Sequence, residues 1–134
     1  MDTISQMLTK IRNAQMAGHK ETRVTFSKFK FALAKILERE GFLEGVFKEE
    51  KEKEKETIRI VLKYINKSKT EKIPAITGIK KVSRPGQRIY IKSENIRKIK
   101  NNFGISVIST SKGVMTGKDS REKKLGGEYV CNVW

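Results

Sequence analysis

The chain has 134 residues, enough for one domain or two small ones with a buried core. Its 30 Lys and Arg residues against 15 Asp and Glu give a net charge of +15. So large an excess predicts a polyanionic partner, most often a nucleic acid. A single Cys excludes an intrachain disulfide, and no apolar run approaches the roughly 18 residues of a membrane span. The first residues resemble neither a signal nor a transit peptide, so we expect no membrane association and no secretion.

Two helices are predicted in the first third of the chain. Apolar residues over positions 4–14 repeat at helical spacing, and Gly18 is the expected end of this helix. A short strand over 23–26 follows, and the second helix is expected from Ser27 to Gly41. Both helices present basic residues on their remaining faces.

From position 42 the apolar period falls to two, which is typical of strands. Strands are predicted over 42–47 and 58–65, joined by the charged run Lys48–Glu56 as a solvated hairpin tip. The segment 66–72 has no apolar residue, and we place a domain boundary after it.

The rest of the chain is predicted to be rich in strands, with a turn at Arg84–Gln87 that contains Pro and Gly, and a short helix that ends at Gly104. The expected strands cover 76–83, 88–92, 105–108 and 129–134. The predicted fold class is α+β, with two small α+β domains. The N-terminal domain, residues 1–72, has two helices on a short sheet. The C-terminal domain, residues 73–134, is mostly antiparallel strands with a short helix.

Basic residues are concentrated in the second domain. Residues 73–134 hold 13 basic and 4 acidic residues, net +9, against 17 and 11, net +6, in residues 1–72. Such side chains neutralise phosphates and release counterions, so we expect salt-sensitive binding to a nucleic acid. For any single lysine, the alternative is that it only keeps the surface soluble. Between positions 77 and 112, one acid, Glu94, opposes nine basic residues: Lys80, Lys81, Arg84, Arg88, Lys92, Arg97, Lys98, Lys100 and Lys112.

The loop expected from Ser109 to Gly113 is the sharper candidate for recognition. Ser109, Thr110 and Ser111 are three consecutive hydroxyls that follow an apolar strand able to hold them rigid. Short hydroxyls reach base edges and ribose 2′-OH groups, while Lys112 and the backbone of Gly113 can meet a phosphate. An ordinary Ser/Thr turn is the alternative interpretation.

RNA is favoured over DNA as the partner. DNA suits the charge equally well, but the sequence has no helix-turn-helix, zinc-finger or basic-zipper pattern. A hydroxyl-rich loop beside a mixed sheet fits the recognition of RNA shape better than insertion of a helix into a major groove. Tyr90, in a basic strand, is a candidate to stack on an unpaired base, with a sheet-core tyrosine as the alternative.

Residues for catalysis are few. His19 is the only histidine, and Cys131 is expected to be a small buried hydrophobe within a strand. No group of His, Cys, Asp or Glu has the spacing of metal ligands. Gly117-Lys118 is followed by Asp119, where a phosphate loop needs Ser or Thr. We therefore expect no enzyme activity, no metal, no cofactor and no small-molecule substrate.

Four stretches of the sequence are distinctive when taken together. They are Ser83-Arg84-Pro85-Gly86, Arg88-Ile89-Tyr90, the run from Ile108 to Thr116, and Leu125-Gly126-Gly127-Glu128. With the first helix, they resemble the bacterial-type small-subunit ribosomal protein S-eight family over essentially the whole chain. The fold that this resemblance implies is two α+β domains, the second mostly strands.

The resemblance implies a structural constituent of the small ribosomal subunit that binds the central domain of small-subunit ribosomal RNA and helps the platform assemble. The implied partners are that RNA and neighbouring small-subunit proteins, including the fifth and the twelfth. An alternative function, which can coexist, is translational repression through the messenger RNA of its own operon. The expected location is the ribosome, in the cytoplasm or in the stroma of an organelle that encodes its own ribosomal proteins.

The resemblance also implies roles for single residues. Ser109, Thr110 and Ser111 are expected to hydrogen-bond bases and sugars, and Tyr90 to pack against a nucleotide. Two lysines at the start of the second helix are expected to contact backbone phosphates. With the basic residues above, the predicted RNA-binding set is Lys28, Lys30, Arg84, Arg88, Tyr90, Ser109, Thr110, Ser111, Lys112, Gly113, Gly126, Gly127 and Glu128.

Overall fold

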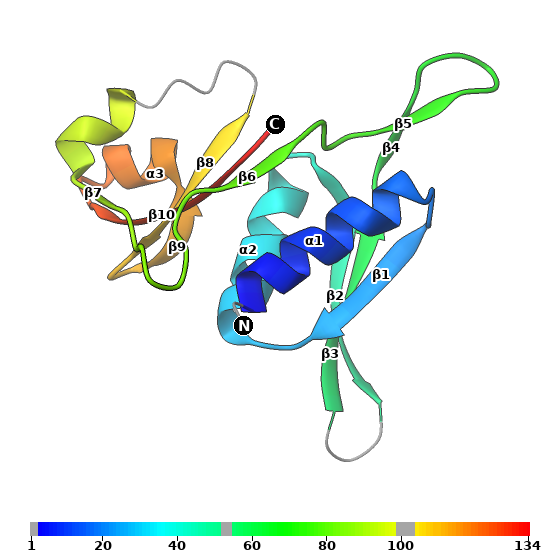
Figure 1. The fold of residues 1–134 in the computed structure, drawn as a ribbon, viewed down its shortest axis with the longest axis horizontal. Coiled ribbons are helices and arrows are strands. Elements are labelled where there is room, and N and C mark those ends of the chain that lie inside the picture. The colour runs from blue at the N-terminus through cyan, green and yellow to red at the C-terminus, as the bar shows by residue number, and fades with distance from the viewer. Residues whose placement is uncertain (1–2, 52–54, 99–103) are drawn as a thin grey trace. The chain divides into compact units, whose positions relative to one another are not determined.

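The computed structural model describes residues 3–51, 55–98 and 104–134 (Figure 1). Its backbone divides into two compact units. The N-terminal unit covers residues 3–76 and the C-terminal unit covers residues 77–134. Each unit has its own sheet and its own buried side chains, so each is described separately.

Two helices belong to the N-terminal unit, α1 (Thr3–Met16) and α2 (Lys28–Arg39). Ser27 caps α2, because its hydroxyl accepts a hydrogen bond from the backbone N–H of Lys30 at 3.1 Å. Gly41 follows the end of α2 with a φ of +87°, a conformation that glycine adopts without strain. The helices bury most of the apolar faces that the sequence predicts: Met7, Leu8, Ile11 and Ala14 on α1, and Leu33, Ile36 and Leu37 on α2. The predicted Ile4 and Phe29 are only partly buried, and Ala34, which was not predicted, is fully buried.

The sheet of this unit has three antiparallel strands in the order β1 (Glu21–Thr25), β3 (Lys55–Leu62) and β2 (Leu43–Lys51). Alternate residues of the strands are buried, including Val24, Val46, Ile58, Ile60 and Leu62. The core of the unit therefore lies between the two helices and one face of this sheet, while the other face is free of helices (Figure 1).

The charged run Lys48–Glu56 is mostly strand, whereas the sequence predicts a loop. Glu49 pairs with Thr57, Glu50 with Glu56 and Lys51 with Lys55 in the ladder between β2 and β3. Lys48 and Glu56 also form an ion pair at 3.6 Å. The backbone ladder continues here although Glu50 and Glu56, which carry the same charge, are paired directly; the ion pair of Lys48 with Glu56 offsets part of their repulsion. Apolar periodicity does not reveal such a polar extension of the strands. Residues 52–54 lie outside the described residues.

The expected single strand over 58–65 is interrupted at Lys63, and a separate small hairpin follows. It consists of β4 (Tyr64–Asn66) and β5 (Lys72–Pro74). Residue 72, where the sequence analysis places the domain boundary, is thus the first residue of β5. The polar segment between these strands is the turn of the hairpin.

The C-terminal unit is built on a five-stranded antiparallel sheet. Its strands run in the order β6 (Ile79–Lys81), β10 (Gly127–Val133), β8 (Ile105–Thr110) and β9 (Gly113–Thr116), and β7 (Tyr90–Ile91) also pairs with β10. Among the described residues of this unit there are two short helices, the 3₁₀ helix η1 (Ser93–Lys98) and α3 (Gly117–Glu122).

The core of the C-terminal unit is formed by the central strands β8 and β10. Val107, Ile108, Cys131 and Val133 are fully buried there. The backbone pairing of β10 continues to the last residue, Trp134, whose N–H and carbonyl both form hydrogen bonds with Gly78 at 3.1 Å. Its indole ring lies where a side chain at Gly78 would project, which explains glycine at that position.

The α+β class predicted from the sequence is confirmed. The described residues form three α-helices and sheets whose paired strands are all antiparallel. Among these residues, the helices are too short and too polar for any of them to cross a membrane.

Candidate nucleic-acid interface

Three strands of the C-terminal unit bring predicted site residues into one row. Glu128 of β10 pairs with Tyr90 of β7 on one side and with Ser109 of β8 on the other. Because directly opposite residues of an antiparallel sheet point to the same face, these three side chains share a face. Tyr90 is 72% exposed, so its ring is a surface ring and not a core tyrosine. A phenol, a carboxylate and a hydroxyl therefore stand side by side; we call this the Tyr90–Glu128–Ser109 row.

The hydroxyl segment is not a five-residue loop, as the sequence analysis expects. Ser109 and Thr110 end β8, Ser111 and Lys112 form a tight turn, and Gly113 begins β9. Gly113 has a φ of +112°, which suits glycine because other residues are strained there. The strand geometry aligns Ser109 with the row and places Thr110 on the opposite side of the pleat.

The three hydroxyls have different environments. The Thr110 hydroxyl donates to the carbonyl of Gly113 at 2.8 Å and accepts from the N–H of Lys112 at 3.1 Å, so it holds the turn together. Within the described residues, the hydroxyls of Ser109 and Ser111 have no hydrogen-bond partner. These two groups are therefore available to a ligand, whereas the hydroxyl of Thr110 is already bonded.

Gly126 and Gly127 allow the strands to approach closely. A Cβ atom on Gly126 would lie 2.6 Å from the carbonyl oxygen of Ile91, and one on Gly127 would collide with the carbonyl oxygen of Ser109. In both cases the added atom would lie far inside van der Waals contact with a backbone carbonyl. The chain at Gly126 and Gly127 therefore fits beside β7 and β8 only because these two residues lack a side chain. The two glycines thus position Tyr90 and Ser109 at the spacing of neighbouring strands.

The segment 83–89 carries two arginines beside this row. Ser83 is buried, and its hydroxyl donates to the carbonyl of Tyr129 at 2.8 Å and accepts from the N–H of Ile89 at 3.0 Å. A turn closes the tip between Arg84 and Gln87, with paired backbone hydrogen bonds of 3.1 and 2.9 Å. The arginines Arg84 and Arg88 are exposed at this tip.

Arg88 links the tip to the row through an ion pair with Glu128 at 3.0 Å. The Glu128 side chain is 19% exposed, so the pair orients a carboxylate that is largely covered. Lys81 lies nearby: burial lowers the pKa of its ammonium, and the positive charge of Arg88 lowers it further. Glu128 thus lies near two cations, Arg88 and Lys81, and Arg84 lies close enough to Lys81 to lower its pKa as well.

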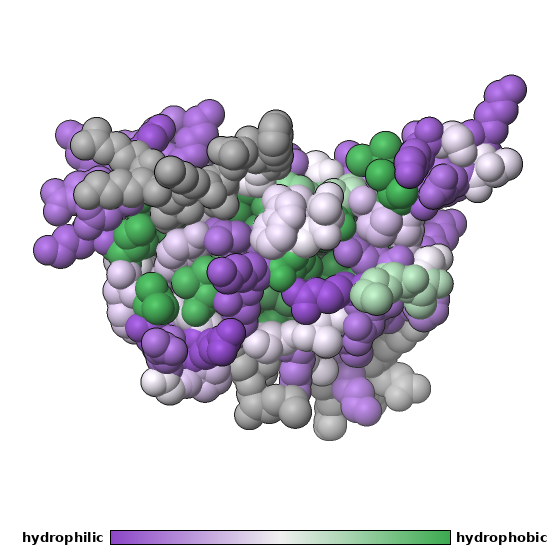
Figure 2. Space-filling view, turned by 45° about the horizontal axis from the view of Figure 1, so that its top comes forward, coloured by the Kyte–Doolittle hydropathy of each residue, from purple (hydrophilic) through white to green (hydrophobic). Residues whose placement is uncertain are grey.

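Other members of the basic set lie in the same unit. Lys80, Lys92 and Lys112 are exposed, and hydrophilic residues gather on the visible face of this unit at the left of Figure 2. Lys100 and the side chains of Arg97 and Lys98 lie outside the described residues.

In the N-terminal unit the two predicted lysines have different positions. Lys28 is exposed, but Lys30 is only 5% exposed, and its ammonium donates to the hydroxyl of Thr25 at 2.7 Å. Lys30 lines a pocket of about 630 Å³ together with Lys10 of α1. Burial lowers the pKa of Lys30, and the charge of Lys10 adds to this effect. We call this the Lys10–Lys30 pocket.

The sequence analysis did not include Lys10 among the site residues. Lys10 lies twenty positions before Lys30 and is one of the unnamed basic residues that the sequence analysis places on the remaining faces of the two helices. Both ammonium groups are held at β1, since Lys10 donates to the carbonyl of Arg23 at 2.9 Å and Lys30 to the hydroxyl of Thr25. Local periodicity does not reveal this placement. An anion in this pocket would relieve the repulsion between the two ammonium groups.

Comparison with known proteins assigns the chain to a family. The family model of ribosomal protein S8 matches residues 2–134. The chain belongs to the ribosomal protein S8 family. It is 47% identical over 133 residues to the small ribosomal subunit protein uS8 of Nitratidesulfovibrio vulgaris (strain DSM 19637 / Miyazaki F), covering 99% of this chain and 98% of that protein. It is 46% identical to the small ribosomal subunit protein uS8c of Phaeodactylum tricornutum (99% and 98% covered) and 44% identical to uS8 of Geotalea uraniireducens (99% and 97% covered).

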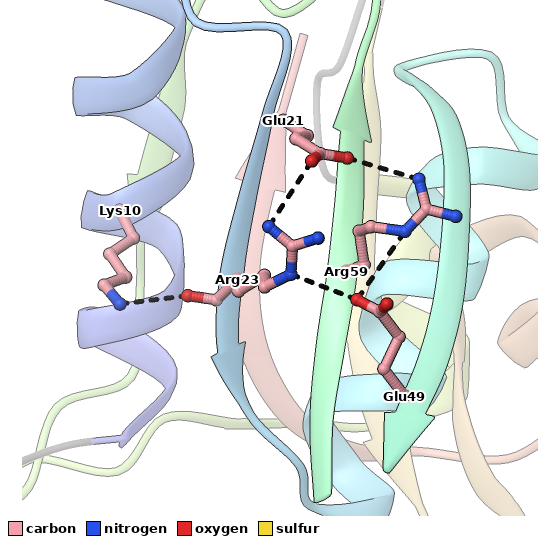
Figure 3. A network of polar contacts seen from close by, with 5 residues as sticks. All are labelled: Lys10, Glu21, Arg23, Glu49 and Arg59. Carbon is pink, nitrogen blue, oxygen red and sulfur yellow. Dashed lines mark hydrogen bonds and ion pairs between the residues drawn. The ribbon is translucent and has the colours of Figure 1, made fainter. Parts of the chain in front are cut away.

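One face of the N-terminal sheet in this S8-family chain is electrically balanced (Figure 3). Arg23 contacts Glu21 at 3.3 Å and Glu49 at 3.1 Å, and Arg59 contacts the same two carboxylates at 3.2 and 3.6 Å. The hydrogen bond from Arg59 lowers the pKa of Glu21, which keeps the network ionised. These two arginines are neutralised locally, so they add little to the field that a phosphate backbone would meet.

Neither a metal centre nor a reactive thiol emerges from the described residues. Among them, no group of three or more His, Cys, Asp or Glu side chains lies close enough together to hold a metal ion. Cys131 is fully buried, and burial raises the pKa of its thiol to about 12. A thiol in this state stays protonated and is a poor nucleophile.

Proposed function

We propose that this S8-family chain is a structural, non-enzymatic component of the small ribosomal subunit that recognises ribosomal RNA through its C-terminal unit, with further phosphate contacts from its N-terminal unit. The observation that carries the proposal is the Tyr90–Glu128–Ser109 row, with the unpartnered hydroxyls of Ser109 and Ser111 and the cations of Arg84 and Arg88 beside it. Such a face combines groups that read nucleotides with groups that neutralise phosphates.

We assign recognition of the RNA to the Tyr90–Glu128–Ser109 row and to the turn that contains Ser111. The exposed ring of Tyr90 offers a stacking platform for one unpaired base, which is worth about 1–3 kcal/mol. The hydroxyls of Ser109 and Ser111 both donate and accept, so they suit base edges and ribose 2′-OH groups. The oriented carboxylate of Glu128 accepts from a base amino group or a 2′-OH, while Arg88 compensates its charge. Because these hydroxyl and carboxylate side chains are short, they can contact bases only where an irregular helix displaces those bases from regular pairing.

Affinity is assigned to the basic residues. Each Lys or Arg that neutralises a phosphate releases condensed counterions, so the binding constant falls with rising salt. The exposed Lys80, Arg84, Lys92 and Lys112 supply this component in the C-terminal unit. In the N-terminal unit, Lys28 and the Lys10–Lys30 pocket supply a second group of phosphate contacts.

The RNA proposed is the central domain of small-subunit ribosomal RNA, where the chain would help the platform assemble beside other small-subunit proteins such as the fifth and the twelfth. The same face would also bind a messenger RNA that presents the same irregular core, so repression of its own operon remains the second candidate. The proposed location is the ribosome, in a bacterial cytoplasm or an organelle stroma.

Separate substitutions test the two components. Ser111→Ala removes a hydroxyl that has no structural bond, so we expect affinity for the central-domain RNA to fall about tenfold while the salt slope stays the same. Lys80→Ala removes one phosphate contact and serves as the matched control, with a slope smaller by about 0.7–0.9. Binding is measured by filter retention at several salt concentrations. If Ser111→Ala bound as tightly as the parent, the assigned role of the turn would be wrong.

A further inference from the structure

An open groove lies at the C-terminal end of α1. It has a volume of about 700 Å³ and is formed by the last turn of α1, the segment that follows it, and the β4–β5 hairpin. Its apolar lining comes mainly from Met16, Tyr64 and Pro74. Met16 is 78% exposed, an unusual state for a large apolar side chain. We call this site the α1–hairpin groove; in the described part of the chain, it shares no lining residue with the Lys10–Lys30 pocket.

The walls of the groove are fixed by hydrogen bonds. The Tyr64 hydroxyl donates to the carbonyl of His19 at 2.5 Å, which ties β4 to the segment after α1. The Gln15 side-chain amide donates to the carbonyl of Ile76 at 3.1 Å, which ties α1 to the chain that follows β5. A groove held open in this way needs little reorganisation to accept a ligand, and preorganisation of this kind favours binding.

The hairpin beside the groove is apolar on both faces. Tyr64 and Pro74 pair across it on the groove side, and Ile65 pairs with Ile73 on the other side. The two isoleucines are 49% and 40% exposed. Figure 2 shows this hydrophobic surface on the arm that projects at the upper right. Exposed apolar surface on such a highly charged protein is typical of a site that another molecule covers. On the groove side this surface is that of Met16, Tyr64 and Pro74; the two isoleucines lie outside the lining of the groove.

The rim of the groove is positive. Lys20 and Lys72 line it, and among the described residues its lining includes no carboxylate. The nearest acids on the neighbouring segments already have partners: Glu21 contacts Arg23 and Arg59, and Glu71 pairs with Lys67 at 4.0 Å. Lys20 is close enough to Glu21 to lower the pKa of that carboxyl, which offsets part of its charge. The groove thus combines an apolar floor with two cations at its edge.

This combination fits one class of occupant. A phosphate backbone gains nothing from Met16 and Pro74, and a second copy of a chain with net charge +15 would bring cations against cations. Methionine and aromatic side chains are enriched at protein–protein contacts, where they adapt to an inserted side chain. We propose that the α1–hairpin groove docks an acidic segment of a neighbouring protein, which inserts an apolar side chain and places carboxylates on Lys20 and Lys72.

A photo-cross-link at the exposed floor of the groove tests this proposal. The variant Met16→p-benzoylphenylalanine is expressed in cells, which are irradiated. The small subunits are then separated from the rest of the lysate, and cross-linked peptides are identified by mass spectrometry in both fractions. We expect a cross-link to a protein segment that carries Asp or Glu beside an apolar residue. Phe47→p-benzoylphenylalanine is the matched control, since Phe47 is an exposed aromatic residue on the balanced sheet face of the same unit.

Charge reversal makes the test specific for the chemistry proposed. Lys20→Glu combined with Lys72→Glu should lower the yield of the protein cross-link about fivefold or more, because complementary charge steers and orients the partner. A cross-link to RNA or to a second copy of the chain would overturn the proposal, as would a yield that charge reversal leaves unchanged or the absence of any cross-link.

The proposal rests on the proposed function in one respect: the partner is sought among the proteins of the small ribosomal subunit. Affinity of the Lys20→Glu, Lys72→Glu variant for the central-domain RNA is measured in parallel and should equal that of the parent. If the unsubstituted chain did not bind the central-domain RNA, the proposed function would be contradicted. The result of the cross-linking experiment would still stand on its own. A cross-link to an acidic segment found outside the small subunit would support the groove while contradicting the proposed function.

Discussion

Ser109, Thr110 and Ser111 look equivalent in the sequence, yet the structure gives them different roles. The Thr110 hydroxyl is bonded to Gly113 and Lys112 within the turn, and those of its two neighbours are free for a ligand. A hydroxyl side chain can serve the backbone or a partner, and only the local geometry decides which. The resemblance assigns all three to RNA; the hydrogen bonds favour a structural role for the middle one.

Thr110→Val should separate these roles. It keeps the shape of the side chain but removes two hydrogen bonds, so the free energy of unfolding should fall by about 1–2 kcal/mol. Trp134 is the only tryptophan and packs within the same unit, so its fluorescence during urea unfolding reports the change. Ser111→Ala is the matched control and should unfold as the parent does. Equal stability of both variants would show that the Thr110 hydroxyl does not hold the turn.

Cys131 allows a second prediction about a single side chain. Burial raises the pKa of its thiol to about 12, so at pH 8.5 the folded chain holds a neutral, covered thiol, while the unfolded chain holds a partly ionised one. Iodoacetamide should therefore label the folded chain about a hundredfold more slowly than the chain in urea. Rapid labelling of the folded protein would contradict the buried placement of this strand residue.

Among the elements, β10 does the most to assemble the candidate interface. It pairs with β6, β7 and β8, so it joins the tip of segment 83–89, the tyrosine and the hydroxyl segment into one surface. Two glycines at its start make this close packing possible. Glycine at positions 126 and 127 is therefore expected both from strand packing and from a role in RNA binding.

Gly127→Ala should disrupt this assembly. The added methyl group would meet the carbonyl of Ser109, part of a backbone that cannot move aside, so we expect a loss of about 2 kcal/mol in the free energy of unfolding. Gly45→Ala is the control: its methyl group would meet only the Phe47 ring, half-exposed and able to rotate away, so the cost should be below about 1 kcal/mol. Circular dichroism during thermal unfolding measures both. Equal effects would contradict the packing argument.

The sequence predicts a helix or strand well where the spacing of apolar residues defines it. It predicts a strand poorly where only backbone pairing with a neighbouring strand defines it. Both long helices and the strands of the buried core follow from the spacing of apolar residues. The polar ends of β2 and β3 do not, since backbone pairing defines them and they carry no apolar residue. The β4–β5 hairpin and β9 were also missed, because three- or four-residue strands carry too little pattern to be distinguished from loops.

The candidate site was predictable to a similar degree. Residue types and approximate positions came from charge, hydroxyl content and resemblance. The alignment of Tyr90, Glu128 and Ser109 depends on the register of three strands. The partnership of Lys10 with Lys30 depends on how residues of two helices meet at β1. Neither is encoded in local spacing.

On the scale of the whole molecule, the excess charge is not spread evenly. Residues 73–134 carry net +9 and hold the candidate interface, whereas the sheet face of the N-terminal unit is balanced by its own acids. A surface with balanced and unbalanced regions can bind RNA on one part and proteins on another. The α1–hairpin groove and the Tyr90–Glu128–Ser109 row are the two surfaces to which we assign these tasks.

The central claim is that charge supplies affinity and the row supplies selection of RNA shape. The most direct test is a salt titration of binding to two RNAs of equal length, the central-domain helix with its irregular core and the same helix with regular pairs in place of that core. We predict tighter binding to the first RNA at every salt concentration, with parallel slopes of log K against log salt, because the phosphate contacts are common to both. Equal affinity for the two RNAs would contradict the account, since only a basic surface would then be needed to explain binding.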